Sequence, residues 1–394
     1  MTAPLKVMLI AAEASGDNLG AGLAHALRKR LGEKASFCGV GGAKMAAEGI
    51  ESPFDIAQLS ILGWIEGIKA YGRVKQRVRD TVNLAKREKP DVAVLIDSWG
   101  FTIRVAKALR EADPSLPLVK YVGPQVWASR PGRAKTLAAA VDHLLAINKM
   151  DLPWFENAGL ATTFVGNPSF GIDFSKADGA RFRTSIDAVA DDPVLLLLPG
   201  SRPGEVERLT PCFEQAVELL REGRPKLKTA VVIADTVRDQ VMGRIAGWPF
   251  RVYPVEGEMQ KLDAMKGATV SLACSGTVST ELALAGSPMV IAYRLGELTY
   301  WLAKKVVTVR FGTLFNIAAD EAIAPEFIQD DCTGANLARA VAERLDDPKL
   351  RADQVARQFA ALEQMGRGAG DPSELAADAL LAFLNARAGA TPSI

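Results

Sequence analysis

The chain has 394 residues, 48% of them hydrophobic and 24% charged, and its 47 Lys and Arg nearly balance its 46 Asp and Glu. That length predicts two domains, and the hydrophobic content excludes a disordered chain. A formal net charge of +1 argues against nucleic-acid binding. The four cysteines are scattered, which argues against a disulfide framework or a structural zinc site and fits a reducing cytosol.

Short apolar runs alternate with helical patterns in the first half of the chain. The predicted strands are residues 7–10, 92–96, 118–122 and 143–147, and the predicted helices include residues 18–31 and 101–111. Continuous apolar runs of this length between helices indicate parallel strands that are covered on both faces.

A polar stretch over residues 173–193 interrupts this pattern and is expected to be irregular. Further strands are predicted at residues 194–198, 229–234, 269–274 and 289–293, and further helices at residues 336–345, 350–364 and 372–386. We therefore expect an α/β protein with two doubly wound Rossmann-like domains, residues 1–170 and 171–365, that face each other across a cleft. A helical tail, residues 366–394, is expected to pack back on the first domain.

No segment reaches the roughly 18 consecutive apolar residues that a membrane-spanning helix needs. The first apolar run is short and stops at Glu13, so it is interpreted as a core strand and not as a signal peptide. The chain has only two histidines, and His25 and His143 both fall within predicted structural elements. If the chain is an enzyme, its general base is therefore expected to be a carboxylate.

Loops that directly follow strands are the expected location of functional residues, because parallel strands end at the cleft. The first such loop contains Ser15, Gly16 and Asp17. Gly16 permits a tight turn, and Asp17 or Asn18 can cap the next helix. A ligand contact and a plain capped helix start both remain open, but the loop lacks the G-x-G-x-x-G spacing of an NAD site.

Asp97 directly follows the apolar run at residues 92–96, so its carboxylate is expected to point into the cleft. The alternative is an N-cap for the helix near Phe101. A general base is favoured because no histidine is available at any motif.

The loop after residues 194–198 contains Gly200, Ser201 and Arg202, with Glu205 in the helix that follows. Backbone N–H groups, a hydroxyl and a guanidinium at the start of a helix suit a diphosphate, although an ordinary turn is the alternative. No D-x-D sequence occurs in the chain, so a metal-bridged diphosphate site is not expected.

A second candidate anion site is predicted at Ser275, Gly276 and Thr277, again between a strand and a helix. Glu281 lies in the first turn of that helix. Its carboxylate is placed either to accept hydrogen bonds from ribose hydroxyls or to stabilise the helix N-terminus.

Residues 59–79 combine an apolar tip with a basic stretch. Ile61, Leu62, Trp64 and Ile65 lie in the tip, and Arg73 is one of the basic residues that follow. This pattern suits the anionic surface of a membrane or an acylated substrate, and a core helix followed by a solvated helix is the alternative.

Together these motifs resemble the lipid-A-disaccharide synthase family, glycosyltransferases of the GT-B type with two Rossmann-like domains. The resemblance covers nearly the whole chain. It rests on Glu13-Ala-Ser-Gly-Asp17, Ile96-Asp97, Val126-Trp127-Ala128, Leu198-Pro-Gly-Ser-Arg202, Ser275-Gly-Thr277 through Glu281, Pro288-Met-Val290, Tyr293-Arg294 and Trp301-Leu302-Ala303.

The resemblance implies transfer from UDP-2,3-diacylglucosamine to 2,3-diacylglucosamine 1-phosphate (lipid X), with inversion at the anomeric carbon and without a metal or cofactor. The products are the β-1,6-linked tetraacyl disaccharide 1-phosphate and UDP. Asp97 and Glu13 are the implied catalytic residues, and Asp97 either removes the proton of the acceptor 6-hydroxyl or only orients the acceptor. Asn316 is implied on the donor side.

The residues implied on the acceptor side are Ser15, Gly16, Asp17, Trp127 and Arg130. The resemblance also implies a peripheral protein on the cytoplasmic, anionic face of the inner membrane. It leaves open a homodimer in which C-terminal elements exchange.

Some positions depart from the family pattern. Trp99 and Gly100 stand where the family has Pro-Asp, and Ser129, Asn167 and Phe315 replace the usual Trp, His and Pro. Most of these departures lie in the half expected to bind the acceptor, so UDP-sugar transfer follows from the pattern more directly than the identity of the acceptor. The alternatives are a related enzyme with a changed acceptor, a UDP-sugar epimerase, and a non-catalytic UDP-sugar-binding paralogue.

Overall fold

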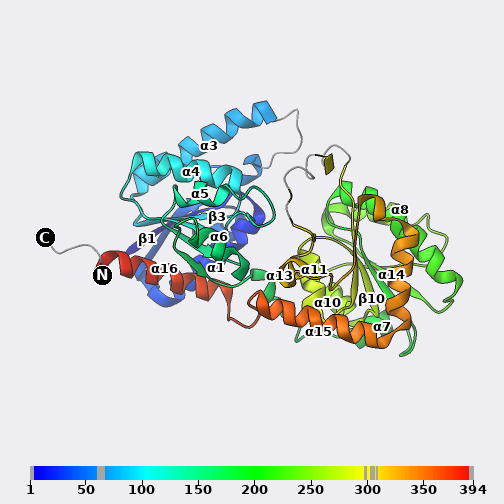
Figure 1. Ribbon diagram of the computed structural model, residues 1–394. Helices are drawn as coiled ribbons and strands as arrows, with labels where there is room; N and C mark the ends of the chain where they lie inside the picture. The colour runs from blue at the N-terminus through cyan, green and yellow to red at the C-terminus, as the bar shows by residue number, and fades with distance from the viewer. Residues whose placement is uncertain (1–3, 60–66, 297–299, 302–306, 308, 390–394) are drawn as a thin grey trace. The chain divides into compact units, whose positions relative to one another are not determined.

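The computed structural model describes residues 4–59, 67–296, 300–301, 307 and 309–389. The chain divides into two compact units, which are unit 1 (Met1–Pro168 with Gly368–Ile394) and unit 2 (Ser169–Arg367). Each unit contains one six-stranded sheet in which all paired strands are parallel, with helices packed on the sheet (Figure 1). The predicted doubly wound α/β architecture is confirmed.

The sheet of unit 1 has the strand order β2-β1-β3-β4-β5-β6. Its strands are β1 (Leu5–Ile10), β2 (Ala35–Val40), β3 (Val92–Ile96), β4 (Leu118–Tyr121), β5 (His143–Ala146) and β6 (Thr162–Phe164). The apolar runs do not predict β2 and β6, because these edge strands bury fewer of their side chains than the central strands do.

Helices cover both faces of this sheet. They are α1 (Ala14–Leu31), α2 (Ala43–Ala47), α3 (Gly67–Glu88), α4 (Trp99–Ala112), α5 (Arg133–Ala138), α6 (Leu152–Glu156) and α16 (Pro372–Gly389). Alternate residues of β1 point to opposite faces, so Met8 and Ile10 pack with α4 and α5, whereas Val7 and Leu9 pack with α1 and α16. The strands are therefore buried on both sides.

The last helix, α16, packs on the first helix, α1, within unit 1. Arg30 Nε lies 2.6 Å from Asp378 Oδ1, and Arg30 also pairs with Glu374. Lys29 Nζ lies 3.1 Å from Glu374 Oε1. The two ends of the sequence thus contribute to the same hydrophobic core.

The sheet of unit 2 has the strand order β12-β11-β10-β7-β8-β9. Its strands are β7 (Val194–Leu198), β8 (Lys228–Val232), β9 (Tyr253–Val255), β10 (Val270–Cys274), β11 (Met289–Tyr293) and β12 (Glu326–Ile328). Its helices are α7 (Gly179–Ser185), α8 (Pro203–Glu222), α9 (Arg238–Ile245), α10 (Glu258–Gly267), α11 (Thr277–Ala285), α13 (Leu314–Ala319), α14 (Gly334–Asp346) and α15 (Pro348–Gln364).

Two local predictions are wrong. The stretch over residues 173–193 is not irregular throughout, because α7 forms within it and Asp178 Oδ1 accepts hydrogen bonds from the N–H groups of Ala180 (2.9 Å) and Arg181 (3.2 Å). Helix α1 begins at Ala14 and not at Asn18, so the loop after β1 is shorter than predicted.

Candidate functional site

The carboxyl end of β3 carries Asp97, and the neighbouring β1 leads into the start of α1. Ser15 Oγ, in the first turn of α1, donates a hydrogen bond to Asp97 Oδ2 over 2.9 Å. Asp97 is partly exposed and Ser15 is exposed. The two predicted residues therefore meet at the carboxyl edge of the sheet, where Asp97 is partly exposed.

Asp97 and Ser98 both adopt left-handed backbone conformations, with φ of 47° and 36°. Such conformations cost free energy in residues other than glycine and persist where the surrounding contacts hold them. Asp97 N–H donates to the carbonyl of Tyr121 (2.9 Å), and the Asp97 carbonyl accepts from Thr102 Oγ1 (2.8 Å). The N-cap alternative for Asp97 is wrong, because Ser98 occupies the N-cap of α4.

A third group that holds this turn is Lys120, which belongs to none of the sequence motifs. It lies on β4, its side chain is buried, and its Nζ donates to the carbonyl of Asp97 and to Thr102 Oγ1, the latter over 2.8 Å. Burial lowers the pKa of Lys120 to about 7, although the charge of Asp97 opposes this effect. The sequence does contain one indication of this role, because a lysine inside the apolar run 118–122 must be buried with polar partners.

Asp17 is bonded to the backbone of a neighbouring segment of unit 1. It is buried, and its carboxylate accepts hydrogen bonds from the N–H groups of Gly42 (2.7 Å), Lys44 (2.9 Å) and Met45 (3.0 Å). The prediction that Asp17 or Asn18 caps α1 is wrong, because Glu13 is the N-cap residue of α1 and Asp17 instead caps α2.

Glu13 and Gly16 have different positions in this segment. Glu13 is exposed at the carboxyl end of β1. Gly16 lies inside the first turn of α1, and a Cβ there would come within 3.2 Å of Ala11 Cβ and 3.5 Å of the Ile96 carbonyl. The missing side chain lets α1 approach the end of β3, which helps to bring Ser15 to Asp97.

The loop after β4 contains Trp127 and Arg130. Trp127 is buried, and its Nε1 donates to Asp151 Oδ1 over 2.7 Å. Asp151 Oδ2 also accepts from Asn148 Nδ2 (3.4 Å), and Asn148 Oδ1 accepts from Asn167 Nδ2 (3.1 Å). Burial raises the pKa of Asp151 to about 6. Trp127 is thus bonded to the interior of unit 1, whereas the Arg130 side chain is exposed.

The loop after β7 in unit 2 turns at Gly200, which has φ of 107°. The conformation favours glycine, and a Cβ at Gly200 would lie 2.5 Å from Glu205 Oε2, so the Glu205 carboxylate would have to move. Arg202 Nη1 lies 2.9 Å from Glu205 Oε1, while the Arg202 side chain is 78% exposed. The Ser201 carbonyl accepts from Thr236 Oγ1 over 2.7 Å.

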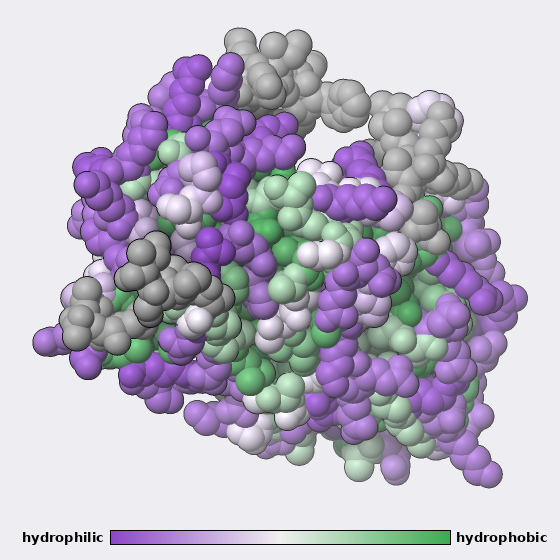
Figure 2. All heavy atoms as spheres, turned by 60° about the vertical axis from the view of Figure 1, so that its left-hand side comes forward, coloured by the Kyte–Doolittle hydropathy of each residue, from purple (hydrophilic) through white to green (hydrophobic). Residues whose placement is uncertain are grey.

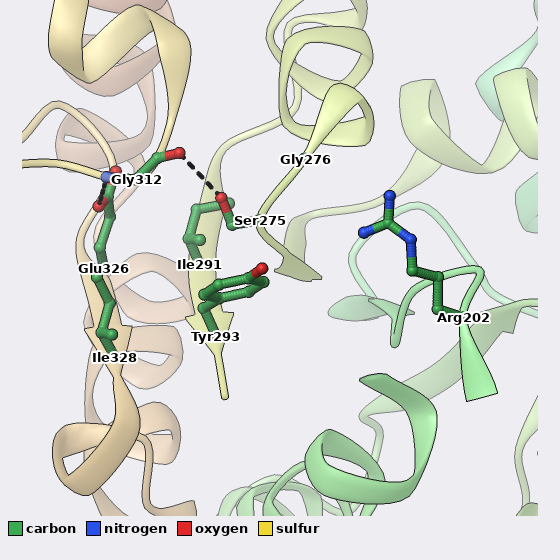
Figure 3. Close-up of a pocket in the computed structure, with 8 residues that line it drawn as sticks. All are labelled: Arg202, Ser275, Gly276, Ile291, Tyr293, Gly312, Glu326 and Ile328. Carbon is green, nitrogen blue, oxygen red and sulfur yellow. Dashed lines mark hydrogen bonds between the residues drawn. The ribbon is translucent and has the colours of Figure 1, made fainter. Parts of the chain in front are cut away.

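A cavity of about 240 Å³ joins this loop to the loop after β10. Its lining residues are Arg202, Ser275, Gly276, Ile291, Tyr293, Gly312, Glu326 and Ile328. Figure 3 shows Arg202 on one side of the cavity, and Ser275, Gly312 and the ring of Tyr293 on the other. Three of these residues were predicted for the donor, and the others come from β11, β12 and the segment between them.

Glu326 on β12 organises one wall of this cavity. Its Oε2 accepts from Gly312 N–H (2.5 Å), and its Oε1 accepts from Thr313 N–H (2.9 Å), Thr313 Oγ1 (2.6 Å) and Asn316 Nδ2 (2.7 Å). Ser275 Oγ donates to the Gly312 carbonyl over 3.1 Å, which ties the two loops together. Glu326 is on a short edge strand, so no sequence pattern marked it.

Asn316 is fully buried. Its amide donates to the Ala324 carbonyl (2.8 Å) and to Glu326, and its Oδ1 accepts from Ala324 N–H (3.1 Å). These contacts make Asn316 a residue that holds the cavity wall from behind. Gly276 (φ 153°) precedes α11, and Thr277 is exposed at the start of that helix.

Glu281 of α11 is paired within unit 2. Its Oε2 lies 3.0 Å from Lys261 Nζ, which also lies 2.9 Å from Glu258 Oε1. The Glu281 side chain is only 16% exposed. A ribose hydroxyl would have to share this carboxylate with Lys261.

Both histidines lie within regular secondary structure, as predicted. His143 is buried on β5, its Nε2 lies 3.0 Å from Thr163 Oγ1, and burial lowers its pKa. His25 is on α1, with Nδ1 3.5 Å from Glu48 Oε1. In the part of the chain that the structure describes, no group of three or more His, Cys, Asp or Glu could hold a metal ion.

The expected membrane-contact residues Ile61, Leu62, Trp64 and Ile65 lie outside the described residues. Arg73 is exposed on α3. In Figure 2, hydrophilic side chains gather at the upper left of the face shown, at the height of α3. Among the described helices, none has both the length and the apolar content required to cross a membrane.

Solved structures with the same fold include the S. aureus MnaA–UDP co-structure, with a TM-score of 0.65 and 16% identity, which covers 97% of each chain. The UDP-GlcNAc 2-epimerase of Neisseria meningitidis bound to UDP-GlcNAc has a TM-score of 0.61 and 12% identity, covering 96% of this chain and 100% of that one. These likenesses show the fold alone.

Sequence relatives give a sharper result. The lipid-A-disaccharide synthase of Paramagnetospirillum magneticum is 40% identical over 380 residues, covering 96% of this chain and 97% of the relative. That of Rhodospirillum centenum is 39% identical over 384 residues, covering 98% and 96%. A family model described as lipid-A-disaccharide synthetase matches residues 7–379. The chain therefore belongs to the family of lipid-A-disaccharide synthases, which are glycosyltransferases.

Proposed function

We propose that Asp97 is the general base of an inverting, metal-independent transfer between the two acylated glucosamine substrates that the family implies, UDP-diacylglucosamine and lipid X. The observation that supports this role is the partly exposed Asp97 carboxylate, which is held at a strand end by its own strained turn and by Ser15. Asp97 takes the proton of the acceptor 6-hydroxyl, the acceptor oxygen forms the new bond to the donor anomeric carbon, and the bond from that carbon to the UDP oxygen breaks. The electron pair leaves with UDP.

The donor binds in the cavity of unit 2. Arg202 and the N–H groups near Gly200, Gly276 and Thr277 stabilise the charge that grows on the departing diphosphate. Glu326 and Asn316 do not touch the donor in this proposal. They hold the wall formed by residues 312–316, so that the cavity keeps its shape when it is empty.

The acceptor binds at the carboxyl edge of the sheet of unit 1. Ser15 orients Asp97 through its 2.9 Å hydrogen bond, and Glu13 is the second exposed carboxylate at this edge. Asp17 acts by holding the backbone at the start of α2, and Trp127 acts through its bond to the buried Asp151. Arg130 is the acceptor-side residue whose side chain reaches solvent.

Both substrates carry acyl chains, so the protein works at a lipid surface as a peripheral protein of the anionic cytoplasmic leaflet. The exposed basic residues of α3, including Arg73, support this placement, because cationic side chains are attracted to anionic lipid head groups. Binding to vesicles that contain anionic lipid should weaken as salt is added, and neutral vesicles should bind little protein.

The decisive experiment incubates the purified protein, in detergent and with EDTA, with UDP-2,3-diacylglucosamine and 2,3-diacylglucosamine 1-phosphate. UDP release is followed together with a disaccharide product by mass spectrometry. A tetraacyl disaccharide 1-phosphate supports the proposal, and its loss in EDTA would contradict metal independence. UDP binding without turnover would favour the alternatives of a changed acceptor or a non-catalytic paralogue.

A further inference from the structure

Two arginines follow β4 on a single turn of backbone in unit 1. Arg130 adopts a left-handed conformation, with φ of 52°, and its carbonyl accepts a hydrogen bond from the Arg133 N–H over 3.0 Å. Arg133 is the first residue of α5. The backbone thus places two guanidinium-bearing side chains three residues apart at the edge of the sheet that carries Asp97.

These two arginines differ from most other arginines of the unit. Arg30 and Arg110 pair with Asp378 and Asp142, whereas no carboxylate of the described residues lies within 4.0 Å of the guanidinium of Arg130 or Arg133. Partial burial and the neighbouring Arg130 both lower the pKa of Arg133. Two neighbouring like charges without a counter-charge form a place where an anion is stabilised.

An aromatic ring ties one of these guanidinium groups to the segment that carries Asp97. Arg133 Cζ lies 5.2 Å from the ring centroid of Trp99, which is within the range of a cation–π contact. Trp99 is the first residue of α4, follows Asp97 after one intervening residue, and packs against the core of unit 1. The ring therefore anchors Arg133 to the same turn that holds Asp97.

We infer that Arg130 and Arg133 form a phosphomonoester subsite for the acceptor, with Trp99 as the surface on which Arg133 is held. This inference rests on the proposed function. A phosphomonoester has up to two negative charges and three acceptor oxygens, and guanidinium groups bind such a group through paired hydrogen bonds. In a hexose, the 6-hydroxyl and the anomeric phosphate are at opposite ends of the sugar, so Asp97 meets one end while the arginines meet the other.

The donor diphosphate does not compete for this subsite in the proposal, because the cavity of unit 2 has its own Arg202 and its own glycine-rich loops. The subsite thus gives the chain a means to select an acceptor with a free phosphate. An acylated glucosamine that has lost this phosphate keeps its nucleophilic hydroxyl but lacks the group that the arginines bind.

The test compares wild type with Arg133→Met on two acceptors, 2,3-diacylglucosamine 1-phosphate and the same lipid without its phosphate. On the phosphorylated acceptor, kcat/KM should fall about 10–100-fold, mainly through a higher KM, because a charge-assisted contact is lost. On the acceptor without phosphate, the two proteins should be equal. Arg133→Lys should recover part of the loss, because it restores the charge without the planar guanidinium.

A matched control is Lys135→Met, which removes one positive charge from an exposed position of the same short helix, two residues away and therefore on another side. Its kcat/KM should stay within about twofold of wild type on both acceptors. Equal losses for Arg133→Met on both acceptors would show a merely structural role and overturn the inference, as would no loss on either.

A binding measurement separates this inference from the proposed function. Glucosamine 1-phosphate and glucosamine are titrated while Trp fluorescence is followed. Wild type should bind the phosphorylated sugar more tightly, and Arg133→Met should abolish the difference, even if no disaccharide is formed. Equal binding of both sugars by wild type would overturn the subsite. The alternative is that Arg133 binds the phosphate of membrane lipid head groups and not that of the acceptor. In that case Arg133→Met would weaken binding to anionic vesicles and leave both sugar titrations unchanged, a result that also overturns the inference.

Discussion

The carboxyl edges of the two sheets are built on the same plan, yet they use their polar residues differently. In unit 1 several polar groups are bonded to the protein itself, as Asp17 is to the backbone of α2 and Trp127 to Asp151. Asp97 is left partly exposed, with Ser15 as its partner. In unit 2 glycine-containing turns and an exposed arginine line a cavity of about 240 Å³.

The difference follows from what each edge must do in the proposed reaction. A general base needs one carboxylate in a defined orientation, so its neighbours are used to hold the backbone. A diphosphate carries charge over many oxygens, so its site needs N–H groups, a guanidinium and room for the ligand. Four changes test this contrast.

The largest effect is expected for Asp97→Asn. The side chain keeps its size but can no longer accept the proton, so turnover should fall about 10²–10⁴-fold. UDP affinity, measured by calorimetry, should be unchanged, because the proposed donor residues are in unit 2. Glu111→Gln, at an exposed carboxylate of α4, should have wild-type activity. Turnover of Asp97→Asn within threefold of wild type would remove Asp97 as the base.

Lys120→Met is expected to come next. The variant keeps the length of the buried side chain but loses the bond to the Asp97 carbonyl, so the strained turn at Asp97 and Ser98 loses one support. A carboxylate misplaced by about 1 Å can cost on the order of 10²-fold in kcat. Steady-state kinetics should show this loss in kcat, with the donor KM near wild type.

The melting temperature gives the check on Lys120→Met. It should not fall, because the substitution removes a buried cation. Thr102→Val keeps the Lys120–Asp97 bond but loses the bond from Thr102 Oγ1 to the same carbonyl, so kcat should also fall, by less than in Lys120→Met. An unchanged kcat in Lys120→Met would mean that the other contacts of Asp97 are sufficient.

Gly200→Ala probes the cavity of unit 2. The new Cβ would lie 2.5 Å from Glu205 Oε2 in a backbone conformation with φ of 107°, which costs about 1–3 kcal/mol. We expect UDP to bind about tenfold more weakly by calorimetry. Gly223→Ala is the matched control, because Gly223 has φ of −105° and open space around its Cβ position. Equal UDP affinities in the two variants would contradict the role of this turn.

The smallest effect is expected for the pH dependence that Asp151 imposes on unit 1. Burial raises the pKa of Asp151 to about 6, so the folded state keeps a proton that the unfolded state releases at lower pH. This contribution to stability is complete below the unfolded pKa and is lost as the pH rises through about 6. The free energy of unfolding of wild type, measured by thermal unfolding, should therefore decrease between pH 4 and 7.

Asp151→Asn removes that titration while its Oδ1 can still accept from Trp127 Nε1. The free energy of unfolding of the variant minus that of wild type should increase as the pH is raised from 4 to 7, by up to about 1–3 kcal/mol. A difference between the two proteins that does not change with pH would show that Asp151 is not the group responsible.

The sequence alone determined the doubly wound architecture and the family, because buried parallel strands appear as continuous apolar runs and the motifs follow them in order. It also located Asp97 and the glycine-containing turns of unit 2, since functional loops follow such strands. It missed the edge strands β2, β6, β9 and β12, and with β12 it missed Glu326. Strands β6, β9 and β12 are too short to leave a pattern, and β2 buries only its second half.

Only the tertiary structure decided which polar residues are available to a ligand. Asp17 and Asp97 both follow buried strands, but the first is used by the N–H groups of α2 while the second is left to Ser15 and solvent. Asn316 and Glu326 meet through segments that are separate in the sequence, and Lys120 reaches the carbonyl of Asp97 from the neighbouring strand. A buried polar group needs a hydrogen-bond partner, and the packing of segments that are separate in the sequence decides which group that partner is.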